Sequence, residues 1–479
     1  MVTVETVERS LSALARGLHA PQEYPVFPSR EILPQAPYSE KVRALVYPVL
    51  FDLVKPDCIY ASTDRGNEGM YHARFGRDGV TVQALILDGV IAAGRRFGFV
   101  ESLDQGLLNN AINGMLSFGR YQAQEDVEER GERKGCLPHE VRTENHFHLT
   151  APKDGNAKPW YFNGREMKNY DSVDVTPLWA FQFGKLVNLG LIEPTPEEFI
   201  QFRKALEWIL QNIVENDGFV GFTFDPNRKY GGPRNQNWMD SEFTMRHQDG
   251  SPQVYPMKPV EVQPISWAAL KNAEPVLRNF GDLSFSAETR KGASYLKDKF
   301  NGEDGFIFED SKGLYLAEAV DGDGRQVRNI TCNPGFLLWA SYGRETIIKD
   351  KEVEQDVIRR LVSSELYDPD AGLRTYSQDT KVFFDPYAYH NGPNTFWPFI
   401  SGIVASGLDE LGYARQAEQL SLSSISAVEK LGSCIEIFQK DGPYLRKFKD
   451  PETGQTSCTD QTWTAAALYY GYHRFLRLA

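Results

Sequence analysis

Residues 236–270 read QNWMDSEFTMRHQDGSPQVYPMKPVEVQPISWAAL, and the change of character within this stretch decides the fold class. The first part is a polar loop that contains aromatic residues. From Glu261 onward, apolar residues recur at the spacing of an amphipathic helix. The loop places Trp238 and Asp240 before this helix, and Glu261 falls in its first turn. This stretch is therefore a long loop that places polar side chains at the start of an apolar helix.

Helical periodicity extends along most of the chain and predicts about twelve helices. Boundary signals agree with it: Gly190 and Gly281 each follow an apolar segment, and Pro194-Thr-Pro-Glu-Glu opens another with acids in its first turn. The expected helices cover residues 41–54, 79–97, 103–120, 174–189, 196–215, 261–277, 284–299, 334–343, 352–364, 394–408, 411–429 and 461–477.

Four of the connections between these segments are long and rich in Gly, Pro, Asn and aromatic residues. They cover residues 133–172, 216–260, 303–333 and 366–393. Long connections in a compact chain are usually functional. If twelve helices pair into six hairpins around a ring, these connections gather at one end and form a cleft there. The sequence thus predicts an all-α fold with a site at one end of a ring.

Short strand-like runs at 218–224 and 305–309 are expected to form β-hairpins that decorate the loops. No low-complexity linker, charge run or close repeat divides the chain. We therefore expect one domain over residues 1–479, with a short N-terminal extension to about residue 38.

Composition limits the partners that the chain can have. Its 65 acidic and 52 basic residues give a net charge of −13, which argues against a nucleic-acid partner. Its 29 Phe, 22 Tyr and 8 Trp exceed the needs of a lean helical bundle, so some are expected to line a pocket. The partner should be neutral or small.

The chain is expected to reside in the cytoplasm. The N-terminal sequence MVTVETVERSLSALARGLHA has neither the basic nor the apolar region of a secretory signal. No apolar stretch approaches the roughly 20 residues of a membrane span. The cysteines are odd in number and widely scattered, which favours small core residues over disulfides or metal ligands. They are Cys58, Cys136, Cys332, Cys434 and Cys458.

Two carboxylates lie in settings that suit glycoside cleavage, which needs a proton donor and a second carboxylate. Asp240 stands beside Trp238, whose ring offers a sugar an apolar face, and Glu436 stands between two isoleucines after a Gly break. Glu261 could grip hydroxyl groups. The alternatives are that Asp240 caps a turn, that Glu261 is an exposed first-turn residue and that Glu436 marks a buried strand edge.

Other polar residues lie in motifs rich in aromatic residues or Gly. Each of them alone is weak evidence for a substrate-binding role. His390 could equally be a core histidine, Asn391 could make a turn with Gly392, and Arg77 with Asp78 could be an ion pair at a helix start. The remaining candidates for substrate binding are His139, Glu140, Tyr170, Asp171 and Trp397.

The ordered series of these motifs resembles the amylo-alpha-1,6-glucosidase domain of glycogen debranching enzymes, from about residue 70 to 470. The motifs are Gly76-Arg-Asp, Tyr170-Asp-Ser-Val-Asp, Trp238-Met-Asp, Lys258-Pro-Val-Glu-Val, Tyr389-His-Asn-Gly with Trp397-Pro, and Glu436. The resemblance implies an (α/α)6 barrel and an inverting exo-glucosidase with Asp240 as acid and Glu436 as base. It also implies a glucose subsite lined by Arg77, Asp78, Tyr170, Asp171, Glu261, His390 and Asn391.

Two departures from this family leave alternatives open. The chain is expected to lack the additional domains of debranching enzymes, which makes a small substrate plausible. The barrel is also similar to that of alkaline and neutral invertases, and Gln461-Thr-Trp463 echoes their terminal motif. Hydrolysis of a small glucoside or sucrose is the first alternative, and a carbohydrate-binding protein without catalysis is the second.

A metal site is not expected. Asp321-Gly-Asp-Gly hints at a calcium loop, but the rest of the ligand spacing and the closing Glu are missing, so a tight turn is favoured. The expected partners are a carbohydrate and water, with no cofactor, and the sequence leaves the oligomeric state open.

Overall fold

The structure is a computed structural model that describes residues 35–63, 70–151, 158–380, 385–450 and 454–477. Most of the N-terminal extension expected to about residue 38 lies outside these residues. The first described helix begins at Gln35 and ends at Leu53.

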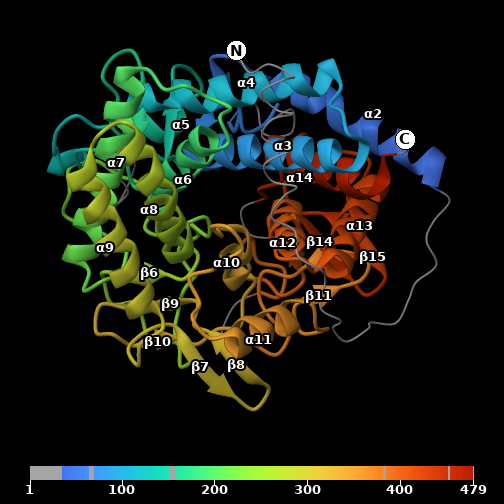
Figure 1. The fold of residues 1–479 in the computed structure, drawn as a ribbon. Coiled ribbons are helices and arrows are strands. Elements are labelled where there is room, and N and C mark those ends of the chain that lie inside the picture. The colour runs from blue at the N-terminus through green and yellow to red at the C-terminus, as the bar shows by residue number, and fades with distance from the viewer. Residues whose placement is uncertain (1–34, 64–69, 152–157, 381–384, 451–453, 478–479) are drawn as a thin grey trace.

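Six helices of the described residues form an inner ring (Figure 1). Each packs against the next in chain order, and the last packs against the first, so the ring closes. The inner helices are α3 (Gly76–Phe97), α6 (Val175–Asn188), α8 (Val262–Asn279), α10 (Phe336–Trp339), α12 (Pro398–Glu410) and α14 (Thr462–Gly471).

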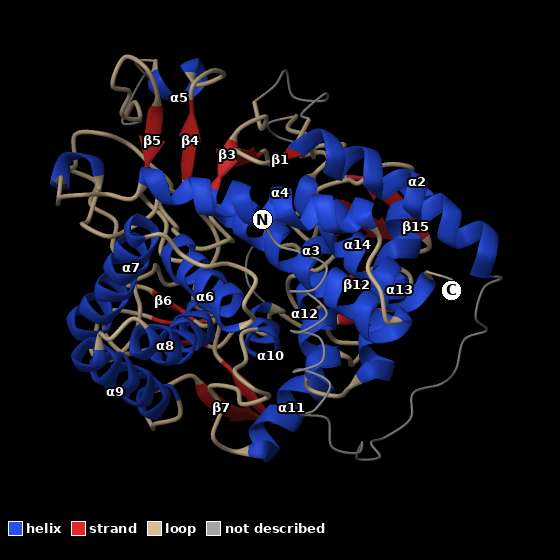
Figure 2. Ribbon diagram, turned by 45° about the horizontal axis from the view of Figure 1, so that its top comes forward, coloured by secondary structure: helices blue, strands red, loops and turns tan. Residues whose placement is uncertain are grey.

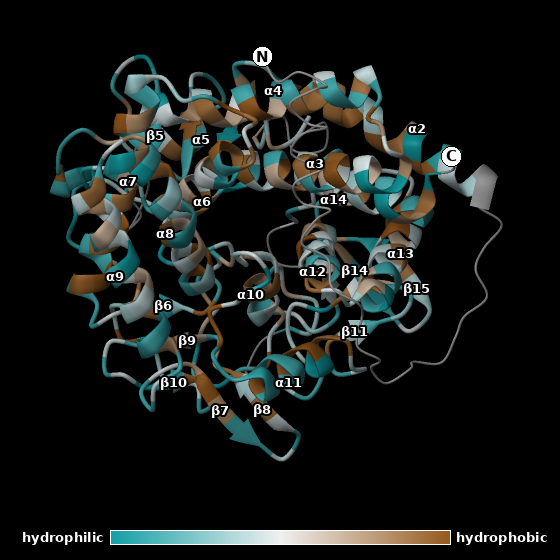
Figure 3. Cartoon of the chain, viewed as in Figure 1, coloured by the Kyte–Doolittle hydropathy of each residue, from teal (hydrophilic) through white to brown (hydrophobic). Residues whose placement is uncertain are grey.

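An outer helix follows each inner one except α14 along the chain, and α11 packs against the 3-10 turn that precedes α10. α2 is the outer partner of α14, so the two ends of the described chain meet in one hairpin. The outer helices are α2 (Gln35–Leu53), α4 (Ser102–Phe118), α7 (Pro196–Glu215), α9 (Leu283–Phe300), α11 (Lys351–Leu361) and α13 (Ala414–Leu431). This is the predicted (α/α)6 barrel. Figure 3 shows hydrophobic and hydrophilic residues mixed along these helices, as amphipathic packing requires.

The two ends of the ring differ in the length of their connections. Inner helices lead to outer ones through short segments, such as 98–101, 280–282 and 411–413. Outer helices return to inner ones through long segments, such as 119–174 and 216–261. The four long connections of the sequence analysis all belong to this second group. They therefore lie at one end of the ring, where the inner helices begin.

Short strands and one small helix occupy the long connections (Figure 2). Three of the sheets have three strands, and the β3-β4-β5 sheet joins the start of α3 to the segment before α6. The small helix is α5 (Phe147–Thr150). The strands are β1 (Val54–Lys55), β2 (Cys58–Ile59), β3 (Arg74–Phe75), β4 (Glu140–Arg142), β5 (Met167–Asn169), β6 (Lys258–Pro259), β7 (Ile307–Asp310), β8 (Gly313–Leu316), β9 (Ala319–Val320), β10 (Gln326–Val327), β11 (Tyr367–Asp368), β12 (Gly372–Leu373), β13 (Thr395–Phe396), β14 (Phe438–Asp441) and β15 (Tyr444–Lys447).

All twelve predicted helices occur, and local chemistry explains their ends. Thr195 and Glu198 form a capping box at the start of α7, with Pro196 at its first position. Gly190 and Gly281 adopt positive φ angles of 68° and 80° beyond α6 and α8. The predicted helix at 334–343 is shorter, because α10 has one turn of 3-10 helix before it and ends at Trp339.

The prediction of a hairpin at 218–224 was wrong. Only Phe222 makes an isolated bridge, to Met257. Side chains satisfy the neighbouring backbone groups instead: Gln263 accepts from the N–H of Val220, and Asn212 accepts from the N–H of Gly221. The second expected hairpin is present as β7-β8.

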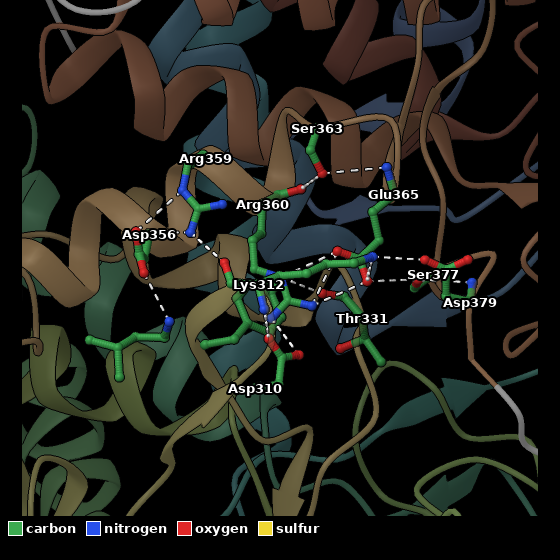
Figure 4. A network of polar contacts seen from close by, with 12 residues as sticks. Asp310, Lys312, Thr331, Asp356, Arg359, Arg360, Ser363, Glu365, Ser377 and Asp379 are labelled. Carbon is green, nitrogen blue, oxygen red and sulfur yellow. Dashed lines mark hydrogen bonds and ion pairs between the residues drawn. The ribbon is translucent and has the colours of Figure 1, made fainter.

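A buried ion network joins this hairpin to α11 and to the connection that follows it (Figure 4). Arg360 of α11 donates to Asp310 at 2.8 Å and to Glu365 at 3.1 Å, and its guanidinium lies 4.8 Å from the ring of Tyr315. Ser377 donates to the same Glu365 carboxylate at 3.0 Å. The network therefore anchors the first part of the 362–397 connection, which carries His390.

Replacing Arg360 with Met should destabilise the protein by about 3 to 5 kcal/mol, because a buried carboxylate, Glu365, loses its main partner. The neighbouring Arg359→Met is the matched control: this side chain is 52% exposed, and we expect a loss below about 1 kcal/mol. Urea unfolding followed by circular dichroism measures both. Equal losses in the two variants would contradict a special role for the buried network.

Candidate active site

The starts of the inner helices converge at the end of the ring that carries the long connections. Several predicted site residues stand at these starts or one position before them. Arg77 and Asp78 lie in the first turn of α3, Glu261 precedes α8, and Trp397 precedes α12. Because side chains at helix starts face the loops rather than the ring interior, the fold gathers residues that are remote in sequence.

Close packing fixes the start of α3. A Cβ atom on Gly76 would lie 2.5 Å from a Val175 methyl carbon and 2.7 Å from the carbonyl oxygen of Pro138, so only glycine fits. This approach sets Arg77 beside Asp174, the residue before α6. The Arg77 guanidinium donates to the Asp174 carboxylate at 2.6 and 3.3 Å, and both side chains are buried. The expected ion pair therefore exists, but with Asp174 rather than Asp78.

Asp240 lies next to this ion pair and is more exposed than the other predicted site acids Asp78, Glu261 and Glu436. Its carboxylate is 3.8 Å from an Arg77 nitrogen and 4.0 Å from His390 Nδ1, and its side chain is 32% exposed. Surrounding protein raises the pKa of Asp240 to about 6, although the charge of Arg77 opposes the rise. Asn235 holds the turn by donating to the carbonyl oxygen of Ser241 at 2.7 Å.

His390 supports the same turn as a neutral ring. The N–H of Ser241 donates to His390 Nδ1 at 3.2 Å, which leaves the ring hydrogen on Nε2. Burial, together with the charge of Arg77, holds the pKa of His390 well below its usual value. The ring stacks on Trp397, with centroids 5.0 Å apart.

Trp238 lies behind His390 rather than facing open space. It is 2% exposed, and its ring packs edge-on against His390 and Trp397. Its indole N–H donates to Asn333 at 3.0 Å. In this structure the ring supports His390, in place of the sugar-stacking face suggested by the sequence. Asn391, the next residue after His390, donates to the carbonyl oxygen of Phe243 at 3.3 Å.

Glu436 has a different environment from Asp240. The hydroxyl of Tyr389 donates to its Oε1 at 2.9 Å, and the N–H of Cys458 donates to its Oε2 at 3.2 Å. The side chain is buried, and its backbone N–H donates to the carbonyl oxygen of Cys458. Donors to both oxygens stabilise the ionised form of a carboxylate. Glu436 therefore differs from Asp240 in its burial and in the donors that contact its two oxygens.

Asp78 connects the two carboxylates electrostatically. Burial raises the pKa of Asp78 to about 8, and the charges of Glu436 and Asp240 add to the rise. Gln461, which precedes α14, donates to Asp78 Oδ2 at 3.0 Å. The structure thus brings Asp78 within electrostatic range of Arg77, Asp240 and Glu436.

Glu261 is a second buried acid that is neutral at neutral pH. Burial raises the pKa of Glu261 to about 8, and Asn237 donates to its Oε1 at 2.7 Å. Its Oε2 has no hydrogen-bond partner among the described residues. Glu261 is therefore buried at the start of α8, and the expected alternative of an exposed first-turn residue does not apply.

His139, which precedes strand β4, and Glu140, its first residue, lie near Arg77 and Asp240. Glu140 accepts from Arg142 at 2.7 Å, and its charge raises the pKa of Asp240. Burial and the charge of Arg77 lower the pKa of His139 well below its usual value. Both residues therefore lie within electrostatic range of the Arg77 cluster.

Tyr170 and Asp171 are both buried and bonded to other parts of the chain. The hydroxyl of Tyr170 donates to the carbonyl oxygen of Tyr121 at 2.7 Å. Both oxygens of Asp171 pair with the guanidinium of Arg228, one of them at 2.6 Å. Asn169 also donates to the Asp171 carboxylate at 3.1 Å. Asp171 thereby ties the 216–261 connection, which carries Asp240, to the segment before α6.

Sequence reasoning missed Asp174, Tyr389 and Gln461 as members of the site. Asp174 and Tyr389 stand inside motifs already noted, but only the folded chain shows that their polar atoms contact Arg77 and Glu436. Gln461 stood out only as part of the Gln461-Thr-Trp463 segment.

Other expectations concern regions outside the cluster. Asp321 closes a tight turn, as predicted, by accepting from the N–H groups of Asp323 and Arg325, and it also pairs with His247 at 2.9 Å. The five cysteines are buried thiols rather than disulfides. No group of three metal-ligating side chains occurs within the described residues. Helices with the length and hydropathy of a membrane span are also absent from that part of the chain.

The pKa of Asp240 predicts a pH profile. If Asp240 is a proton donor, it must be protonated to act, so kcat/KM should fall as the pH rises through about 6. In Asp174→Asn, the loss of a negative charge lowers the pKa of Asp240, and this limb should move to lower pH by about one unit. The exposed Asp249→Asn is the control and should leave the limb in place. A shift to higher pH in Asp174→Asn would contradict the assignment.

No protein-family model matches the sequence, and no curated protein sequence matches it. Solved structures do match the fold. A structure named as a glycosidase has a TM-score of 0.54 at 14% identity, covering 92% of this chain and 97% of that one. A glucoamylase from Saccharomycopsis fibuligera has a TM-score of 0.51 at 14% identity, over 92% and 96%. A GH63 mannosylglycerate hydrolase from Thermus thermophilus has a TM-score of 0.50 at 14% identity, over 91% and 99%. The chain has the (α/α)6 glycosidase fold.

Proposed function

We propose that this chain, which has the (α/α)6 glycosidase fold, is an inverting glycoside hydrolase that removes α-linked glucose from oligosaccharides or branched glucans, in the manner of an amylo-alpha-1,6-glucosidase. The contrast between Asp240 and Glu436 carries the proposal. Asp240 has a raised pKa and a partly exposed carboxyl group, whereas Glu436 accepts hydrogen bonds at both oxygens. Environments that separate two carboxylates in this way assign them the roles of acid and base.

In the proposed reaction, Asp240 gives its proton to the glycosidic oxygen as the bond from that oxygen to C1 breaks. Glu436 takes a proton from a water molecule, whose oxygen bonds to C1 from the opposite face. The products are the shortened glycan and β-glucose. The proton balance is closed when Asp240 and Glu436 exchange protons with solvent.

The remaining cluster suits a sugar with several hydroxyl groups. Asp78 and Glu261 are protonated at neutral pH, so each can donate as well as accept. Arg77 supplies a fixed positive charge. The Thermus mannosylglycerate hydrolase of the same fold was solved with glucose bound, which supports a sugar ligand here.

A small glucoside or sucrose remains a second candidate. The Gln461-Thr-Trp463 segment echoes the invertase pattern, and its Gln461 lies in the site as a donor to Asp78. The binding protein without catalysis is less favoured, because binding alone does not need an acid and a base in such different environments.

A panel of isomaltose, panose, a limit-branched dextrin and sucrose tests the substrate class. We expect glucose release from the α-1,6-linked substrates. Activity on sucrose alone would favour the invertase-like function. Absence of hydrolysis on every substrate would refute the proposal.

A further inference from the structure

The far end of the ring, where the inner helices finish, carries a cavity of about 410 Å³, which we call the far-end cavity. Its floor includes the buried residues Phe181, Trp339 and Tyr470, and its mouth includes Asn188 and Glu410. The volume falls within the range of about 300 to 1,000 Å³ that is typical of small-molecule sites.

The topology explains why this end stays open. The described connections between inner and outer helices are shorter here than at the other end, and the longest of them, 340–350, contributes Ser341, Tyr342 and Gly343 to the cavity wall. The cavity is also distant from the proposed active site. Asp88 lines the cavity eleven residues after Arg77 on α3, which corresponds to about 16 Å along a helix.

Asp88 organises the floor of the cavity. Its carboxylate accepts from Lys185 of α6 at 2.9 Å, from the indole of Trp339 of α10 at 3.2 Å and from Ser406 of α12 at 2.6 Å. Four inner helices therefore meet at one carboxylate. Lys185 forms an ion pair with Asp88, and these hydrogen bonds hold the side chains of the cavity floor in place without a ligand.

The other charged groups at the cavity are also paired. Arg474 donates to Asp409 at 2.7 and 2.9 Å, and Arg95 lies 3.4 Å from Glu410. A charged ligand would have to compete with these pairs. Neutral polar side chains also line the cavity, namely those of Asn188, Asn272 and Ser341, and Asn188 donates to the carbonyl oxygen of Asn272 at 3.0 Å. Apolar walls with convergent neutral polar groups suit a ligand that carries hydroxyls on a carbon frame.

We propose that the far-end cavity binds a neutral polyhydroxy compound of the size of a hexose, at a site separate from the active site. Asn188 and Ser341 line the cavity beside the Asp88 floor. The proposal does not depend on the function assigned to the other end of the ring.

Saturation-transfer NMR with D-glucose tests this site, using variants that fill it. Ser341→Trp and Asn188→Trp each place a large side chain at the cavity. Leu283→Trp is the matched control, because Leu283 is 65% exposed at the start of α9 and does not line the cavity. We expect the wild type and the control to show two saturable glucose-binding events and each filling variant to lose one of them, while all four proteins keep the same hydrolytic activity.

A crystal structure of the wild type with D-glucose locates the ligand. We expect density on the Asp88 floor. Glucose confined to the Asp240 end, or a glucose signal that both filling variants leave unchanged, would overturn the proposal, as would a cavity that holds only water at saturating glucose. Loss of activity in the filling variants would instead show a disrupted ring and would also count against a separate site.

Discussion

Asp240→Asn is expected to lower hydrolysis of isomaltose by about 10² to 10⁴-fold, the usual contribution of a positioned proton donor. Asparagine keeps the size of the side chain but cannot protonate the departing oxygen. An α-glucosyl fluoride should keep most of its hydrolysis rate, because fluoride leaves without protonation. The measurement is kcat/KM on both substrates at one pH.

The control for this prediction is the same chemical change at a surface acid. Asp249→Asn should leave both rates unchanged, since Asp249 is 54% exposed and pairs only with surface groups. If Asp240→Asn reduced both substrates equally, Asp240 would not be the proton donor. The nearby Asp78, whose pKa is raised to about 8, would then be the next acid to test.

Glu436→Gln is expected to lower hydrolysis of both substrates by about 10² to 10⁴-fold. Glutamine still accepts hydrogen bonds from Tyr389 and Cys458, so the local geometry should persist. It cannot take a proton from water, however, and water attack is required whether the leaving group is a sugar or fluoride. The two substrates should therefore lose activity together, in contrast to Asp240→Asn.

Glu261→Gln is the matched control for Glu436→Gln. The pKa of Glu261 is raised to about 8, so the residue is neutral at pH 6, and an amide closely replaces a protonated carboxyl group. We expect a change in kcat/KM of less than about tenfold, the effect of one neutral hydrogen bond. An equal loss in both variants would show that Glu436 has no special role as a base.

The sequence predicted the helices well because their signals are local. Apolar periodicity, the Thr195 cap and the glycine stops act within a few residues of the helix they define. The hairpin predicted at 218–224 failed because side chains from Asn212 and Gln263 occupy its backbone groups. Those partners lie on neighbouring helices, so the alternation of apolar residues alone could not reveal them.

The candidate site was predicted in part, for a related reason. Residue type and motif order singled out Arg77, Asp78 and Asp240, which the fold brings together. The partner of a charged group, in contrast, is a property of the folded chain. The pairing of Asp171 with Arg228 depends on a long connection returning to the start of α6. The hydrogen bonds that Tyr389 and Cys458 donate to Glu436 also depend on the folded chain, so the sequence alone could not reveal them.

The anomeric form of the glucose released first tests the central claim most directly. Inversion follows if Asp240 protonates the leaving oxygen while Glu436 directs water to the opposite face of C1. Proton NMR of isomaltose or panose during the first turnovers should therefore show β-glucose before mutarotation. Release of α-glucose first would mean that configuration is retained, and it would contradict the roles given to Asp240 and Glu436.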